Sequence, residues 1–399
     1  MELNRLHTWS YQQIKRTNSS FKRYLYEQID WKNRLNIIIG MRGTGKTTIM
    51  LQYAKNELPF DESTIYVSLD DIYFSSNSLV VFVEEFVKRG GKYLLIDEAQ
   101  KYPNWSKEIK SIYDNFPELQ ITISGSSAIS ILKGEGDLSR RALIYQLHGL
   151  SLREFAEMKY QQKFDTISLE QIINNGTSIS ISISNEIKPI KLFEEYLVHG
   201  YYPFSINDEN NFAQRMLQVM NVILENDIPA VNNIDYNATL KMKQLLGIIA
   251  ESVPFKPNIT KLAGQLSLSR ETLLKYLQVL AKADVILLLY SSTKGISALN
   301  KPEKIYLQNP NIAYLLASQN ANTGNIRETF FVNQLQINHH VEYPAKGDFL
   351  INKKYTFEIG GKNKTNQQIK DLPDAYIAAD NIEIAIGNKI PLWMFGFMY

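Results

Sequence analysis

The 399-residue sequence contains no cysteine, only five histidines and no long uninterrupted apolar run. The absence of cysteine excludes disulfides, thiol catalysis and cysteine-ligated zinc. The scattered histidines leave little for a metal site. The opening residues, Met1 to Asn4, do not begin a signal peptide, and no apolar stretch approaches the length of a membrane span. We therefore expect a cytoplasmic protein with no membrane partner.

A large charge excess is also lacking, because 43 lysines and arginines balance 41 aspartates and glutamates. This balance neither requires nor excludes nucleic acid as a partner. Apolar residues make up 44% of the chain and charged residues 21%, as in soluble globular proteins. The length exceeds that of one ordinary core, so we expect two or three domains.

The most informative stretch is an aliphatic run, Ile37–Ile39, followed by a glycine-rich loop and a helical pattern. The loop has the form Gly-x-x-x-x-Gly-Lys-Thr, whose backbone N–H groups and helix N-terminus bind phosphates. In such a loop Lys46 lies between the β- and γ-phosphates of ATP, and the Thr47 hydroxyl ligates Mg²⁺. The expected phosphate-binding residues are Gly40, Met41, Arg42, Gly43, Thr44, Gly45, Lys46, Thr47 and Thr48.

A second buried strand, Tyr93–Ile96, ends in the acidic pair Asp97-Glu98. Asp97 at the carboxyl end of this strand is suited to hold a water on Mg²⁺. Glu98 is suited to activate the attacking water as a general base. One βα unit separates this pair from the loop, so the two motifs corroborate each other.

Further candidates follow a strand at Leu119–Ser124. Ser124 at its end is a candidate sensor of the γ-phosphate, with a helix N-cap at Ser126 or Ser127 as an equal alternative. A loop at Gly134–Ser139 leads to Arg140 and Arg141. One of these arginines would stabilise charge on the γ-phosphate, in cis or across a subunit interface, and surface ion pairing is the alternative.

These motifs, in this order, resemble the prokaryotic AAA-type ATPases of the archaeal ATPase group. The segments that carry the resemblance are Gly-x-Arg-x-x-Gly-Lys-Thr-Thr, Leu-Leu-Ile-Asp-Glu-Ala-Gln, Ile-Ser-Gly-Ser-Ser and Leu-Ser-Leu-Arg-Glu-Phe. The resemblance implies a winged-helix segment and a C-terminal domain of unknown function, of the DUF4143 type, related to restriction-endonuclease folds. Family members usually have Gly-Arg after Gly-Ser-Ser. This chain has Ser139-Arg140-Arg141 instead, which leaves the choice of finger arginine open.

The spacing of apolar residues predicts the secondary structure of the N-terminal segment and of the middle of the chain. Phe21 to Ile29 has helical spacing and predicts one helix up to about Trp31. Thr177–Ser184 alternates strictly, which favours a strand, with an edge strand or mobile hairpin as an equal alternative.

Three helices and a β-wing are predicted within residues 239–307, which together make a winged helix-turn-helix. Ser269 is the expected N-cap of the third helix, and Leu273, Leu274, Leu277 and Leu280 are its expected buried stripe. The candidates for DNA contact are Arg270, Lys275 and Tyr276. Packing against another part of the chain or against a partner protein is an equal alternative.

The last part of the chain has an α/β pattern, with a helix that begins at Glu328, a hairpin at 347–359 and a strand at 382–386. A restriction-type nuclease needs an acidic residue followed by Glu-x-Lys to hold Mg²⁺. Asp348 and Glu358 fit this pattern, but Gly360 occupies the lysine position, and Lys362 lies beyond a Gly-Gly pair. We therefore expect a degenerate domain that does not cleave.

The predicted fold class is α/β: a P-loop AAA-type nucleotide domain with a parallel sheet, then a helical and winged-helix region, then a restriction-endonuclease-like α/β domain. The expected boundaries are 1–156, 157–235, 236–310 and 311–399. The expected function is an ATP-hydrolysing molecular switch that uses Mg²⁺, with DNA, another protein or a second copy of the chain as candidate partners. The alternatives are a slow-turnover regulatory or defence-associated DNA-binding module and an ATP-gated Mg²⁺-dependent nuclease.

Overall fold

A computed structural model describes residues 2–125, 138, 140–206, 208–229, 235–251, 256–292, 301–317 and 321–399. The chain divides into two compact units, Met1–Gly149 and Leu150–Tyr399. The Ser126 and Ser127 N-cap candidates and most of the predicted loop at Gly134–Ser139 lie outside the described residues. None of the helices within the described ranges is long and apolar enough to cross a membrane.

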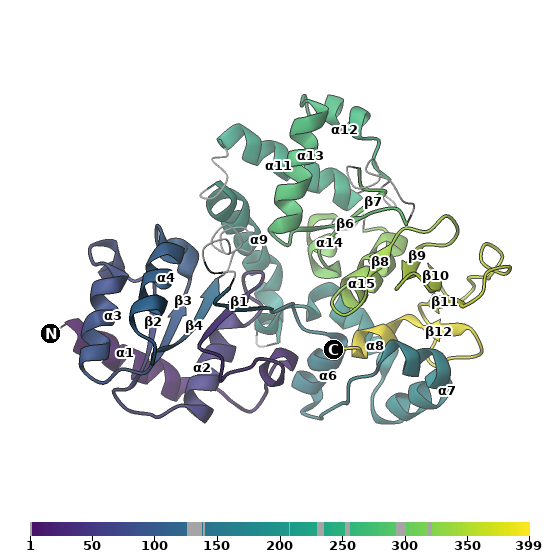
Figure 1. Ribbon diagram of the computed structural model, residues 1–399. Helices are drawn as coiled ribbons and strands as arrows, with labels where there is room; N and C mark the ends of the chain where they lie inside the picture. Colours follow the sequence, from purple (N-terminus) through teal and green to yellow (C-terminus); the bar gives the residue numbers. More distant parts are fainter. Residues whose placement is uncertain are drawn as a thin grey trace. The chain divides into compact units, whose positions relative to one another are not determined.

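The first unit is built on a parallel sheet with strand order β2-β3-β4-β1-β5. Its strands are β1 (Leu35–Ile39), β2 (Thr64–Ser68), β3 (Tyr93–Asp97), β4 (Gln120–Gly125) and β5 (Leu143–Gln146). Its helices are α1 (Glu2–Arg16), α2 (Lys46–Glu57), α3 (Leu79–Lys88) and α4 (Trp105–Asn115) (Figure 1). Because all five strands are parallel, their carboxyl ends meet at one edge of the sheet, where ligands bind in such folds.

Alternation along the strands divides the apolar core of this unit into two layers. Ile37 and Ile39 of β1 join the layer that contains the apolar faces of α3 and α4. Ile38 points the other way and joins the layer that contains Ile49 and Met50 of α2. This two-sided burial explains why the strands read as continuous apolar runs.

The N-terminal helix lies earlier in the chain than the sequence predicts. The α-helix is α1, whereas the predicted helical segment contains only a 3₁₀ turn, Tyr24–Glu27. The helical spacing was misleading because tertiary contacts fix this segment: the Gln52 amide donates to the carbonyl oxygens of Asn18 and Phe21, at 2.8 Å each. Ser10 of α1 accepts a hydrogen bond from Tyr66 N on edge strand β2 at 2.8 Å.

The second unit begins with helices and ends with a mixed sheet. Its helices are α6 (Leu152–Tyr160), α7 (Leu169–Glu186), α8 (Pro189–Glu195), α9 (Phe212–Val222), α11 (Tyr236–Glu251), α12 (Ile259–Gln265), α13 (Arg270–Lys282), α14 (Pro310–Ala317) and α15 (Thr323–Leu335). Its strands are β6 (Ile286–Leu289), β7 (Lys304–Leu307), β8 (Val341–Glu342), β9 (Phe349–Ile351), β10 (Tyr355–Gly360), β11 (Ala375–Ala379) and β12 (Lys389–Pro391). The predicted α/β class, with a parallel sheet followed by helical and further α/β regions, is confirmed.

Three helices and a hairpin follow the predicted order in this unit. Strands β6 and β7 pair antiparallel after α11, α12 and α13. The Ser269 side chain caps α13 by accepting from Thr272 N at 3.0 Å. Leu274 is only half-buried, and Val279 takes its place in the buried stripe. The identity of this region as a winged helix stays a prediction.

The alternating segment Thr177–Ser184 is helical, so the predicted strand or hairpin is wrong. It lies in α7, which opens with a capping box between Ser168 and Gln171. Alternation failed as a signal because Ile181 is 46% exposed, whereas Ser180 is buried. The Ser180 hydroxyl accepts a hydrogen bond from Ala385 N at 3.1 Å, so a tertiary contact sets this face of the helix.

The C-terminal part has the mixed strand order β12-β11-β10-β9-β8. The predicted hairpin corresponds to β9 and β10, which pair antiparallel. Two predictions are wrong: Glu328 lies inside α15, which Asn322 caps, and residues 382–386 form no strand. The strands that follow β10 are instead β11 and β12. They lie on either side of residues 382–386, and β11 pairs parallel with both β10 and β12.

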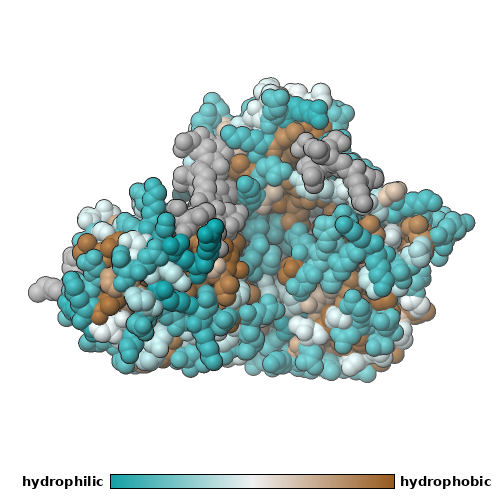
Figure 2. Space-filling model, viewed as in Figure 1, coloured by the Kyte–Doolittle hydropathy of each residue, from teal (hydrophilic) through white to brown (hydrophobic). Residues whose placement is uncertain are grey.

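On the face drawn in Figure 2, hydrophobic residues reach the surface in scattered groups among hydrophilic ones. Isolated exposed apolar residues of this kind are normal in folded proteins. Among the described residues on this face, no single broad apolar patch stands out to define a partner.

Candidate nucleotide-binding site

The glycine-rich loop joins β1 to α2 in the way that the sequence predicts. Gly45 has φ 100°, a left-handed conformation that glycine adopts without strain, and helix α2 begins at the next residue. Gly40 lies so close to Leu147 that a Cβ there would be 2.3 Å from the Leu147 carbonyl oxygen. The loop therefore needs glycine at both positions to hold its shape.

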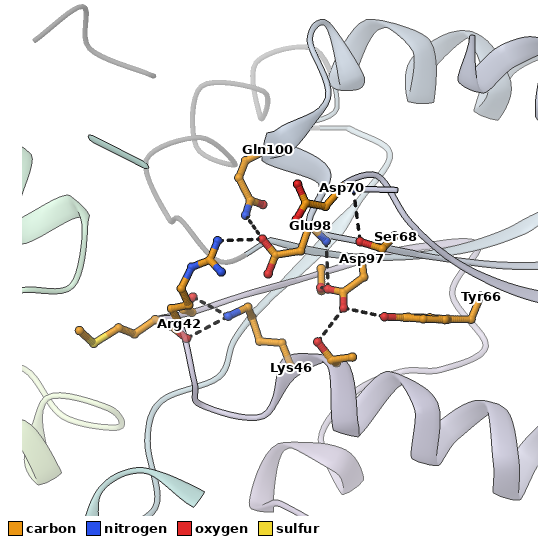
Figure 3. Close-up of polar contacts among 12 residues, drawn as sticks. Arg42, Lys46, Tyr66, Ser68, Asp70, Asp97, Glu98 and Gln100 are labelled. Atoms are coloured by element: carbon orange, nitrogen blue, oxygen red, sulfur yellow. Dashed lines mark hydrogen bonds and ion pairs between the residues drawn. The ribbon is translucent and has the colours of Figure 1, made fainter. Parts of the chain in front are cut away.

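The Lys46 side chain is folded into this loop. Its ammonium donates to the carbonyl oxygens of Gly40 and Met41, at 2.9 Å each, and the residue is only 6% exposed (Figure 3). A buried ammonium held by carbonyl dipoles is a strong attractor for an anion. This arrangement places a positive charge where the loop's N–H groups and the α2 N-terminus also favour phosphate.

Asp97, at the end of β3, connects the loop helix to two neighbouring strands. Its Oδ2 atom accepts from Thr47 Oγ1 at 2.6 Å and from Tyr66 OH at 2.9 Å. Its Oδ1 atom accepts from the Ser124 hydroxyl and from Glu98 N. Burial and the Asp97 charge raise the pKa of Tyr66, so its hydroxyl stays a donor.

Glu98 follows Asp97 in a left-handed backbone conformation, with φ 53°. Non-glycine residues adopt this conformation at a cost, and such residues cluster at functional sites. The Glu98 Oε2 atom accepts from Arg42 Nη2 at 3.1 Å and from Gln100 Nε2 at 2.7 Å (Figure 3). Sequence reasoning identified Glu98 and Arg42 but missed their ion pair and the contact with Gln100.

Ser124 and the two arginines differ in their surroundings. Ser124 lies beside Asp97, where its hydroxyl is already engaged. Arg141 forms a two-pronged ion pair with Asp114, with N–O distances of 2.9 and 3.0 Å. Arg140 is exposed. The structure therefore gives Arg141 the surface ion pair that the sequence offered as an alternative.

Arg23 is a supporting residue that sequence reasoning missed. Its buried guanidinium donates to the carbonyl oxygen of Thr44 in the loop, and to those of His148 and Gly149 at 2.8 Å each. Burial, and then the nearby Arg23 charge, lower the pKa of His148 to about 4. No local pattern predicts these contacts, because the partners are distant in sequence.

The DNA-contact candidates lie on α13 as expected. Arg270 and Lys275 are exposed, whereas Leu273, Leu277 and Leu280 on the same helix are buried. Tyr276 is half-buried, and burial, with a smaller effect of Asp235, raises its pKa.

The C-terminal candidates lie beside a buried lysine that the sequence did not reveal. Lys304 of β7 is 2% exposed and contacts Glu328 Oε2 at 2.7 Å and Asp348 Oδ1 at 3.3 Å. Burial alone would lower the pKa of Lys304, but the two carboxylates outweigh it and raise the pKa. Within the described ranges, no three His, Cys, Asp or Glu side chains are grouped so as to hold a metal ion.

Glu358 pairs with Lys364 at 2.5 Å, not with the predicted Lys362. Lys362 is exposed and lines an open hollow of about 470 Å³ together with Arg327 and Lys364. The structure thus brings Asp348 and Glu358 into one charged region, where Lys304 pairs with Asp348 and Lys364 with Glu358.

Comparison with known proteins identifies part of the chain. Residues 32–156 match a family model described as an AAA domain. This match covers the five-stranded parallel sheet and ends shortly after the N-terminal unit, so the unit is similar to AAA domains. Residues 190–323 match a domain of unknown function (DUF8612), which spans the predicted winged helix and parts of both neighbouring regions. The predicted nuclease-fold relationship of the C-terminal part therefore stays a prediction.

Two uncharacterized proteins of Methanocaldococcus jannaschii are similar over most of this chain. One is 26% identical over 315 residues, which is 73% of this chain and 66% of that protein. The other is 25% identical over 358 residues, 84% of this chain and 74% of that protein. This chain thus matches about two thirds and three quarters of their lengths.

Solved structures show weaker likenesses. A Walker-type ATPase of Pyrococcus abyssi is 12% identical, with a TM-score of 0.43, covering 75% of this chain and 97% of that one. AMPPCP-bound DnaA from Aquifex aeolicus is 15% identical, with a TM-score of 0.25, covering 69% and 88%. At these TM-scores the likenesses add nothing about individual residues.

The Lys304 cluster gives a stability prediction. Lys304→Ala leaves the Glu328 and Asp348 carboxylates without their ammonium partner, which costs about 3–5 kcal/mol for a buried pair. Urea unfolding should show this decrease in the free energy of unfolding. The exposed control Lys362→Ala should change it by about 0.5 kcal/mol or less. A Lys304→Ala variant as stable as the control would show that the Lys304 ion pairs do not stabilise the fold.

Proposed function

We propose that the N-terminal unit binds and hydrolyses ATP with Mg²⁺, as a molecular switch of the AAA type. The observation that carries this proposal is the 2.6 Å hydrogen bond between Thr47 and Asp97, close to the Lys46 ammonium. It joins the phosphate loop to the acidic strand end, the two halves that a triphosphate site requires. The match of residues 32–156 to an AAA domain supports it.

The ATP phosphates would lie along the N–H groups of residues 43–48. Lys46 would exchange its contacts with the Gly40 and Met41 carbonyls for the β- and γ-phosphates. Hydroxyl and carboxylate oxygens suit a hard cation, so Thr47 and Asp97 would hold Mg²⁺ directly or through water. The cation would neutralise phosphate charge there.

Glu98 would accept a proton from the attacking water at its carboxylate, which polarises the water as it approaches the γ-phosphate. Of the two arginines, Arg140 is the better candidate for charge stabilisation, because Asp114 already engages Arg141. Ser124 would act through Asp97 and not by direct contact with phosphate.

Two substitutions separate binding from turnover. Lys46→Ala removes the charge that bridges the phosphates, so ATP binding should be lost. Glu98→Gln keeps that charge and should bind ATP, while turnover falls by about 10²–10⁴-fold, the contribution of a general base. Equilibrium binding of labelled ATP and steady-state phosphate release measure the two effects. Wild-type ATP affinity in Lys46→Ala would contradict the role of Lys46 in phosphate binding. Unchanged hydrolysis in Glu98→Gln would contradict the role of Glu98 as general base.

A second proposed activity is DNA binding through α13. Its support is the exposure of Arg270, at the first position of the helix, and of Lys275, on the side opposite the buried leucines. Two cations on one helix neutralise phosphates without reading bases. The competing interpretation is that this helix packs against a partner protein.

Replacing Arg270 and Lys275 with Ala should weaken binding to all DNA sequences alike. The slope of log K against the logarithm of the salt concentration should also become less steep by about two, near one for each lost phosphate contact. Gel-shift titrations at two salt concentrations measure this. The control Lys32→Ala/Lys107→Ala removes the same charge from exposed positions of the first unit. Wild-type protein that shifts no DNA at either salt concentration would end the DNA interpretation.

We also propose that the C-terminal region does not cleave nucleic acid. Its support is a set of ion pairs: Lys304 pairs with Glu328 and Asp348, and Lys364 pairs with Glu358. Ammonium groups therefore lie beside the carboxylates with which a nuclease would hold Mg²⁺. Supercoiled plasmid incubated with the protein, Mg²⁺ and ATP should stay intact on a gel. Nicking that disappears in an Asp348→Asn variant would contradict this proposal and favour the ATP-gated nuclease.

A further inference from the structure

Arg42 and Lys46 belong to the same loop but make different contacts. Lys46 folds back onto the loop's carbonyl oxygens, whereas Arg42 reaches across to Glu98 (Figure 3). The Arg42 and Glu98 side chains are 26% and 22% exposed, so this ion pair is neither free in solvent nor buried. Solvent screens a pair of this kind only in part, so breaking it should cost about fivefold in a binding constant.

This pair engages the carboxylate that the proposed reaction needs. Arg42 Nη2 and Gln100 Nε2 both donate to the same oxygen, Glu98 Oε2. Two hydrogen bonds to one carboxylate oxygen occupy the lone pairs with which that oxygen would otherwise contact an attacking water. Glu98 has this contact at a left-handed backbone position directly after β3.

A bound triphosphate changes the charges that Arg42 experiences. Arg42 lies in the phosphate loop, and its guanidinium contacts Glu98, the group proposed to act at the γ-phosphate, so a γ-phosphate bound there would lie within reach of Arg42. Guanidinium binds phosphate at least as well as carboxylate, and often through two hydrogen bonds. A γ-phosphate there competes directly with Glu98 for Arg42, whereas ADP has no group at that place.

We propose that Arg42 is a positioning residue that pairs with Glu98 and exchanges it for the γ-phosphate when ATP binds. This inference rests on the proposed ATP site and names its regulation: the triphosphate itself frees the general base. ATP binding then includes the cost of breaking one ion pair, and ADP binding does not. The exchange makes the site sensitive to the γ-phosphate with no further domain or partner.

A double-mutant cycle on nucleotide selectivity tests the exchange. The quantity is the ratio of the dissociation constant for ADP to that for a non-hydrolysable ATP analogue, measured by calorimetry for wild type, Arg42→Met, Glu98→Gln and the double variant. Glu98→Gln should raise the ratio by about three- to tenfold, because ATP no longer breaks the pair and the nearby negative charge is gone.

The decisive comparison is the effect of Arg42→Met in the two backgrounds. If Arg42 changes partner, its removal should lower the ratio about fivefold more in the Glu98→Gln background, where no pair has to break first. The same effect in both backgrounds, within about twofold, would overturn the exchange. It would leave Arg42 as a phosphate ligand or a structural residue that keeps its partner.

Controls separate this inference from the proposed function. Arg89→Met removes another arginine that pairs with a carboxylate, Glu85, in the same unit and should leave the ratio unchanged. If Lys46→Ala binds nucleotide with wild-type affinity, both the proposed site and the exchange are overturned. If nucleotide binds through Lys46 but wild-type protein releases no phosphate, the hydrolytic function fails, and the cycle still decides the exchange.

Discussion

The N-terminal unit depends on the hydrogen bonds that converge on one carboxylate, that of Asp97. Donors from the start of α2, from β2 and from β4 all point at it, so it ties the phosphate loop to three adjacent strands. A buried carboxylate is costly unless its oxygens are satisfied, and here each oxygen accepts two bonds. The same hydrogen bonds that stabilise the strand ends place the Asp97 carboxylate, the proposed Mg²⁺ ligand, beside the phosphate loop.

The charged side chains of this site contact other groups of the protein. Lys46 is held by carbonyl dipoles and Glu98 by Arg42 and Gln100, so both groups that are proposed to act on the γ-phosphate have partners within the protein. The second unit uses charge differently: Lys304 is nearly fully buried between two carboxylates, where an ion pair fixes structure.

The N-terminal fold and the candidate site were predictable because they depend on local patterns. A buried strand, a glycine-rich loop and a helix start are adjacent in the sequence, and the acidic strand end lies one βα unit later. The pairs Arg42–Glu98 and Lys304–Glu328 were not predictable, since each depends on how separate elements pack. The strand predicted at Thr177–Ser184 was wrong for a related reason: alternation describes one face only if burial follows it, and here tertiary hydrogen bonds of Thr177 and Ser180 fix a helix instead.

A crystal structure with a non-hydrolysable ATP analogue and Mg²⁺ tests the central claim most directly. The account predicts the triphosphate within the loop of residues 40–48, with the cation beside Thr47 and Asp97. It also predicts that Lys46 Nζ leaves the Gly40 and Met41 carbonyls for the phosphates. Nucleotide bound elsewhere, or a loop-bound nucleotide with Lys46 still on those carbonyls, would contradict it.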